Sequence, residues 1–143
     1  MCMTVFVAAR EPLPFIVWNE AEPAFHLQAI SDAEESVRGR FTKPNVYFLG
    51  AHTGCSCGFN YGLREVRGAE DQAEEVASRA SVSALRAYLR DAVERQGEVE
   101  LFSSWEEDWV NEPEQTLRIT PDWFSGDSFA MPEKVLFRVT ADA

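Results

Sequence analysis

A long amphipathic segment between residues 73 and 92 constrains the fold of this chain more than any other feature. Its apolar residues recur at spacings of three and four, which places them on one face of a helix: Ala73, Val76, Ala77, Ala80, Ala84, Tyr88 and Ala92, with Leu85 and Leu89 widening the stripe. Gly97 follows where a helix C-cap is expected. Serines at 78, 81 and 83 interrupt good helix formers, so we expect the helix over about 79–96, or a helix in two pieces.

The segments on both sides of this helix are predicted to be strands, which makes a sheet its partner. Short runs rich in apolar, β-branched and aromatic residues occur at 4–8, 15–18, 25–30, 46–49, 98–104, 115–120 and 135–140. Ser31 stands three residues before Glu34, as in a capping box, and predicts a short helix near 32–40. Because helices and strands do not alternate regularly, we expect one α+β domain over 1–143, mostly antiparallel, with the long helix packed on the sheet.

The charge distribution bears on the partners of the chain. With 24 acidic and 13 basic side chains, the formal net charge is −11, which argues against binding to a nucleic acid backbone. The whole excess lies in residues 69–78 and 98–114, which hold four and seven acidic residues and no basic ones. A solvated surface is the simplest interpretation of both runs, and a docking surface for a basic protein partner is the alternative. The oligomeric state stays open.

The chain has no segment that predicts membrane insertion or secretion. No run approaches the roughly 18 apolar residues of a membrane helix. The first residues lack the basic and apolar regions of a signal peptide, and three cysteines cannot all pair within one chain. We therefore expect a cytoplasmic protein that does not interact with membranes.

One segment, residues 50–59, concentrates the residues that carry chemistry. It holds His52, Cys55 and Cys57 among three glycines, directly after a predicted strand. Two thiolates and an imidazole suit zinc or another soft metal. A fourth ligand is needed for a closed tetrahedral site, and Cys2 would supply it if the strands at 4–8 and 46–49 were antiparallel neighbours; His26 is the alternative. The predicted metal site is therefore Cys2, His52, Cys55 and Cys57.

Two other interpretations of the same residues stay open. Cys55 and Cys57 could cycle between dithiol and disulfide, with His52 lowering a thiol pKa, although the spacing is Cys-x-Cys and not Cys-x-x-Cys. The cysteines could also be buried structural residues, with the acidic surface serving protein interaction. The chain has no Gly-rich phosphate loop, Gly-x-Ser-x-Gly or His-Glu-x-x-His motif, so the sequence does not favour an enzyme.

The cysteine motif also carries a resemblance. Met1-Cys2, then 46–50 with the sequence Val-Tyr-Phe-Leu-Gly, then 54–59 with Gly-Cys-Ser-Cys-Gly-Phe resemble short hypothetical bacterial proteins of unknown function. The resemblance extends over much of the chain and rests on this short motif. It implies no activity and transfers no catalytic residue, so the substrate class is not predicted.

Overall fold

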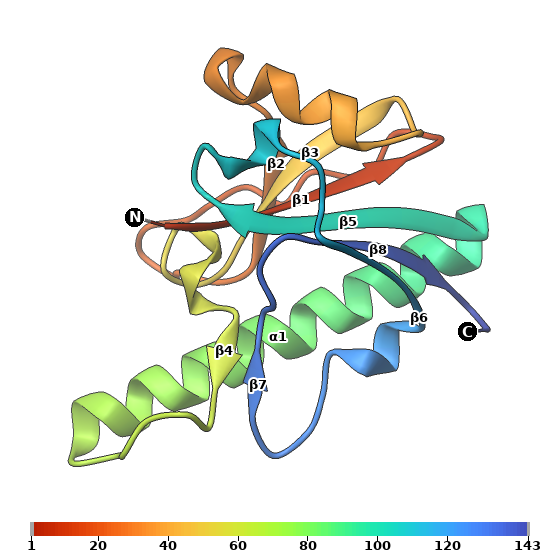
Figure 1. The fold of residues 1–143 in the computed structure, drawn as a ribbon. Coiled ribbons are helices and arrows are strands. Elements are labelled where there is room, and N and C mark those ends of the chain that lie inside the picture. Colours follow the sequence, from red (N-terminus) through yellow and green to blue (C-terminus); the bar gives the residue numbers. More distant parts are fainter. Residues whose placement is uncertain (1, 143) are drawn as a thin grey trace.

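The computed structural model describes residues 2–142, and its centre is a six-stranded sheet with one long helix, α1, across one face (Figure 1). The strand order is β2-β3-β1-β5-β8-β6. All neighbouring strands are antiparallel except β6 and β8, which are parallel. The strands are β1 (Met3–Ala9), β2 (His26–Ala29), β3 (Asn45–Gly50), β5 (Glu98–Trp105), β6 (Gln115–Ile119) and β8 (Val135–Thr140). The predicted α+β class and mostly antiparallel sheet are confirmed.

Helix α1 (Ala69–Gln96) is continuous and begins earlier than the predicted start near residue 79. The serines that argued for a later start do not break it: Ser78 and Ser81 are buried, and the Ser81 hydroxyl has a partner outside the helix. Acidic side chains at Glu70 and Asp71 in the first turn suit the positive end of the helix dipole. The first half of α1 extends past the sheet beside β4 (Asn60–Tyr61), which pairs with β7 (Phe129–Ala130) (Figure 1).

The sheet is covered on both faces, and this is why β1 is buried along its whole length. On one face, Leu85 and Leu89 of α1 pack with strand residues such as Phe137 in the larger core cluster. On the other face, the short helix η1 (Asp32–Arg40) contacts η3 (Asp108–Val110) over a smaller cluster that contains Phe6 and Trp109. The short helix predicted over 32–40 is confirmed as a 3-10 helix.

The acidic run 98–114 is not wholly the solvated surface that its composition indicates. Glu100 has no exposed surface, although it lies within that run. Its Oε1 atom accepts hydrogen bonds from the backbone N–H groups of Thr42 and Lys43 at 2.9 and 3.0 Å, and its Oε2 lies 3.8 Å from Arg138 Nη1. This carboxylate therefore fixes the chain between η1 and β3 to the sheet and is no part of a docking surface.

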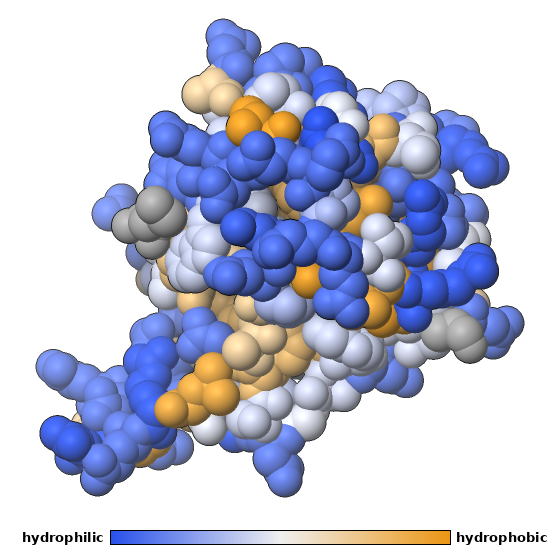
Figure 2. Space-filling model, in the orientation of Figure 1, coloured by the Kyte–Doolittle hydropathy of each residue, from blue (hydrophilic) through white to orange (hydrophobic). Residues whose placement is uncertain are grey.

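The outer surface is mainly polar on the side drawn in Figure 2, and apolar side chains gather on it near β4 and β7. Within residues 2–142, no helix combines the length and the apolar character needed to cross a membrane.

Candidate metal centre

Antiparallel pairing of β1 with β3 brings the beginning of the chain beside the cysteine loop. Val5 pairs with Leu49, so the start of β1 lies next to the end of β3 and to η2 (Ser56–Gly58). The Cys2 carbonyl also accepts a hydrogen bond of 2.7 Å from the backbone N–H of Glu106, just after β5. The neighbouring strands on which the prediction for Cys2 depended are thus present.

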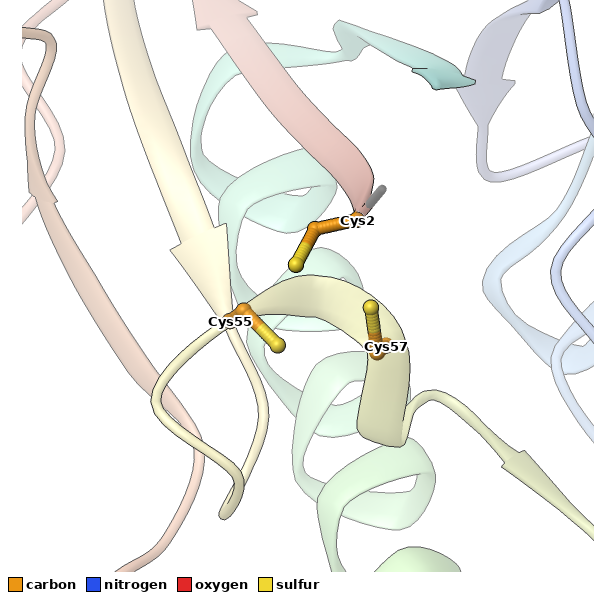
Figure 3. Close-up of side chains that lie close together, drawn as sticks. All are labelled: Cys2, Cys55 and Cys57. Atoms are coloured by element: carbon orange, nitrogen blue, oxygen red, sulfur yellow. The ribbon is translucent and has the colours of Figure 1, made fainter. Parts of the chain in front are cut away.

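Three thiols meet at this end of the sheet. The sulfur atoms of Cys2, Cys55 and Cys57 all lie within 4.8 Å of one another. Figure 3 shows the three side chains pointing toward one shared space, two from the loop and one from the start of β1. None of them forms a disulfide, and each is partly exposed. The three are called the cysteine cluster below.

Ser56, between the two loop cysteines, fixes the loop to two strands at once. Its buried hydroxyl donates to the carbonyl of Leu49 at 2.6 Å and accepts the backbone N–H of Val5 at 2.9 Å. The sequence marks this residue only as a small polar side chain between two candidate ligands, so its positioning role was not predicted. Ser56 therefore sets the position of both neighbouring cysteines relative to β1.

Two glycines allow the backbone path of the loop. Gly54 has a φ of +87°, in the left-handed region that other residues rarely adopt. At Gly58, a Cβ atom would stand 2.8 Å from the Cβ of Ala51 and 2.9 Å from the His52 ring, closer than real contacts allow. The loop thus turns tightly at Gly54 and packs closely at Gly58.

The two loop thiols differ in their acidity. Burial raises the pKa of Cys57 to about 11; a hydrogen bond from the Met3 backbone N–H at 3.2 Å opposes this effect, and the neighbouring Cys55 adds to it. Burial also raises the pKa of Cys55, but hydrogen bonds from the Thr53 hydroxyl and the Cys57 backbone outweigh it, so that pKa is lowered from its ordinary value. Cys55 is therefore the more readily ionised thiol of the pair.

His52 lies outside the cysteine cluster, although the sequence predicted it as a ligand. Its Nδ1 is 3.1 Å from the Ser81 hydroxyl and its Nε2 is 2.9 Å from Glu74 Oε1, both on α1. Its backbone N–H also donates to Ser81 at 3.0 Å. Both ring nitrogens thus have partners on the helix. His52 is not among the residues whose ligand atoms all lie within 4.8 Å of one another.

The alternative ligand, His26, is also not part of the cluster. Its ring is buried against Trp18, with ring centroids 4.8 Å apart, and its Nδ1 lies 3.3 Å from the Ala24 carbonyl. Its role in this structure is packing at the β2 edge of the sheet.

The cysteine cluster could bind a metal ion with little rearrangement. Zinc–sulfur bonds of about 2.3 Å in a tetrahedron put the sulfurs about 3.8 Å apart, and here they are within 4.8 Å. Three protein donors leave a fourth coordination position for water or another molecule. No protein-family model matches the chain, and no curated protein or solved structure is significantly similar to it.

Proposed function

We propose that this protein binds a soft metal ion, zinc in the first place, through the thiolates of Cys2, Cys55 and Cys57. The observation that carries the proposal is the convergence of three sulfur atoms within 4.8 Å from two segments distant in the sequence. The hydrogen bond from the Met3 backbone N–H to Cys57 Sγ connects these two segments across 54 residues of sequence.

Burial as small hydrophobes explains these cysteines less well. Free structural cysteines are among the most buried residues, whereas all three thiols here are partly exposed. The conformation of the loop also depends on two glycines, at positions where a side chain would be strained or crowded, and on a buried serine. Such a fixed arrangement favours thiolates held ready for a shared ion.

The donor set narrows the choice of metal. Three sulfurs and no imidazole form a softer set than the mixed one expected from the sequence, and such sets select zinc or copper(I) over calcium or magnesium. With water in the fourth position, the site would have the open coordination that zinc shows outside closed structural sites.

Metal analysis of the protein purified without chelator tests the proposal. We expect about one zinc per chain in the unaltered protein and in His52→Gln, because the imidazole is engaged with α1. In Cys2→Ser, Cys55→Ser and Cys57→Ser the metal should be lost. A metal-free native protein that takes up no added zinc, or full zinc content in all three serine variants, would contradict the proposal.

A second candidate function, thiol–disulfide exchange, draws on the closeness of three partly exposed thiols, whose sulfurs lie within 4.8 Å of one another. The Cys55 thiolate would attack a substrate disulfide and release one substrate thiol. Cys57 or Cys2 would then attack Cys55 in the mixed disulfide and release the second. The protein would gain a disulfide as the substrate gains two thiols, and an external dithiol would restore it.

Counting thiols in chelator-treated protein separates the two functions. Exchange predicts one free thiol after incubation with a small disulfide, and three after reduction. Three thiols under both conditions would exclude the cycle and leave metal binding untouched.

A further inference from the structure

A small pocket lies directly beside the cysteine cluster, and Cys57 belongs to both. Its volume is about 270 Å³, just below the usual range of about 300–1,000 Å³ for ligand pockets. The walls are mainly apolar and come from four parts of the chain; they include Met3, Phe59, Leu63, Trp105 and Met131.

Several polar groups in the wall are already paired with other groups of the protein. The Asn60 side-chain amide donates to the Cys57 carbonyl, and the Trp105 indole N–H donates to Glu133. The Ser56 hydroxyl is engaged with β1 and β3. A polar ligand would therefore find few free partners, and desolvating it would not be compensated.

The charge of the pocket wall further limits the class of ligand. The Glu133 carboxylate is the one charged group among the residues lining the pocket, and it disfavours a second negative charge brought in by an acidic ligand. An uncharged molecule with an apolar body fits these walls best.

The neighbouring cysteine cluster determines which donor atom the ligand should carry at its other end. Three thiolates leave one coordination position on a bound metal, and a metal in such a soft set prefers sulfur as a further donor. Cys57 belongs both to the cysteine cluster and to the pocket wall, so a ligand in the pocket would lie beside a metal held by the cluster. Met3 reinforces the junction, because it lines the pocket while its N–H donates to Cys57 Sγ at 3.2 Å.

We infer that the site takes a small thiol with an apolar body, whose sulfur completes the metal coordination while its hydrocarbon part occupies the pocket. This inference rests on the metal site proposed above. On binding, the thiol displaces the coordinated water and gives up its proton to solvent; no bond within the ligand changes.

Cobalt(II)-substituted protein provides the test, because its thiolate absorption bands report the donor set directly. The ligand used is cyclohexanethiol. Cyclohexanol has the same ring without sulfur, and 2-mercaptoethanol has sulfur without the apolar body. We expect cyclohexanethiol to shift the cobalt bands at a concentration at least tenfold lower than 2-mercaptoethanol, and cyclohexanol to leave them unchanged.

A pocket-filling variant gives the matched control. Ala130 lines the pocket from an exposed position on β7, so Ala130→Phe should occupy the space without disturbing the core. We expect it to weaken cyclohexanethiol binding at least tenfold while cobalt content and the response to 2-mercaptoethanol stay unchanged. Ala130→Ser should behave as the unaltered protein.

The outcomes separate the two proposals. If cobalt binds but cyclohexanethiol leaves the bands unchanged, or binds Ala130→Phe as tightly as the unaltered protein, the inference is overturned and the metal site stands. Equal affinity for cyclohexanethiol and 2-mercaptoethanol, or removal of cobalt by the thiol, also overturns the inference. If the protein binds neither cobalt nor zinc, the proposed function fails first, and the inference with it.

Discussion

The loop between β3 and β4 presents two groups of candidate ligands to opposite neighbours. Cys55 and Cys57 face the start of β1 and gather with Cys2, whereas His52 faces α1 and is held by Ser81 and Glu74. The sulfurs are partly exposed and lie beside one another; the imidazole nitrogens already have partners. Closeness in sequence therefore does not decide which side chains meet: three sulfurs from two distant segments gather at one point, while an imidazole three residues from Cys55 contacts the helix.

The largest effect should be the difference in zinc affinity between a variant of the cysteine cluster and a variant of His52. Cys55→Ser should lower the zinc affinity by more than about 100-fold, because losing a ligand exceeds the 10- to 100-fold effect of changing its supporting partner. Competition with a chromophoric chelator measures this.

The matched change in the other group is His52→Gln, for which we expect less than about a threefold change in zinc affinity. Similar losses in the two variants would remove the distinction between the two groups and return the imidazole to the ligand set.

Ser56→Ala should have the next largest effect, on stability. The change leaves the buried N–H of Val5 and the carbonyl of Leu49 without their partner. An unsatisfied buried group costs about 1–3 kcal/mol, and urea denaturation of the metal-free protein should show a loss of that size. As a control, Ser83→Ala on the exposed side of α1 should stay within about 0.5 kcal/mol.

The same variant also tests whether Ser56 positions the cluster. Zinc affinity should fall about tenfold, as for other groups that support metal ligands. Unchanged affinity in a destabilised protein would confine Ser56 to a structural role.

Ser81→Ala tests from the helix side whether His52 is separate from the cysteine cluster. It removes the acceptor of the His52 backbone N–H and the partner of Nδ1. We expect a loss of about 1 kcal/mol in unfolding free energy, with zinc content still at one per chain. A Ser81→Ala protein that loses its zinc would connect the helix side of the loop to the metal and contradict the separation of the two groups.

A smaller effect is expected at a pair remote from both groups. The hydrogen bond from Lys43 Nζ, at 2.9 Å, lowers the pKa of Glu98 despite the opposing effect of burial. A carboxyl with a depressed pKa in the folded state stabilises the fold above its unfolded pKa, near 4.5, and loses that contribution as the pH falls through the folded value.

Lys43→Met should therefore lower the free energy of unfolding by about 0.2–1 kcal/mol at neutral pH, the usual range for partly exposed ion pairs. This loss should become smaller as the pH falls below 4.5. Unfolding in urea at several pH values measures it. A cost that does not change with pH would show that the lysine stabilises by packing and not by charge.

Much of the fold followed from local patterns. Alternating and continuous apolar runs placed β1, β3, β5 and β8, and the capping box placed η1, because these signals depend on near neighbours in the chain. The pairing of β4 with β7 was not foreseen, since two-residue strands carry no periodicity. The early start of α1 was missed because the serines that lower helix propensity are used for buried contacts across the structure.

The site was predictable to a similar extent. Cys2 could be connected to the loop by one assumption about strand neighbours, and that assumption holds. The orientation of His52 could not be foreseen, because it depends on the left-handed turn at Gly54 and on partners that α1 brings from elsewhere. The burial of Glu100 within an acidic run could not be predicted either, because the Thr42 and Lys43 backbone N–H groups that bind it are distant in sequence.

In the proposed site, sulfur alone, and no imidazole, supplies the protein ligands of the metal. X-ray absorption at the zinc edge of the loaded protein distinguishes these two kinds of ligand. We predict three sulfur scatterers at about 2.3 Å and one lighter atom at about 2.0 Å, without the outer-shell scattering of an imidazole ring. A zinc ion coordinated mainly by nitrogen and oxygen, or one showing imidazole scattering, would contradict the three-cysteine site.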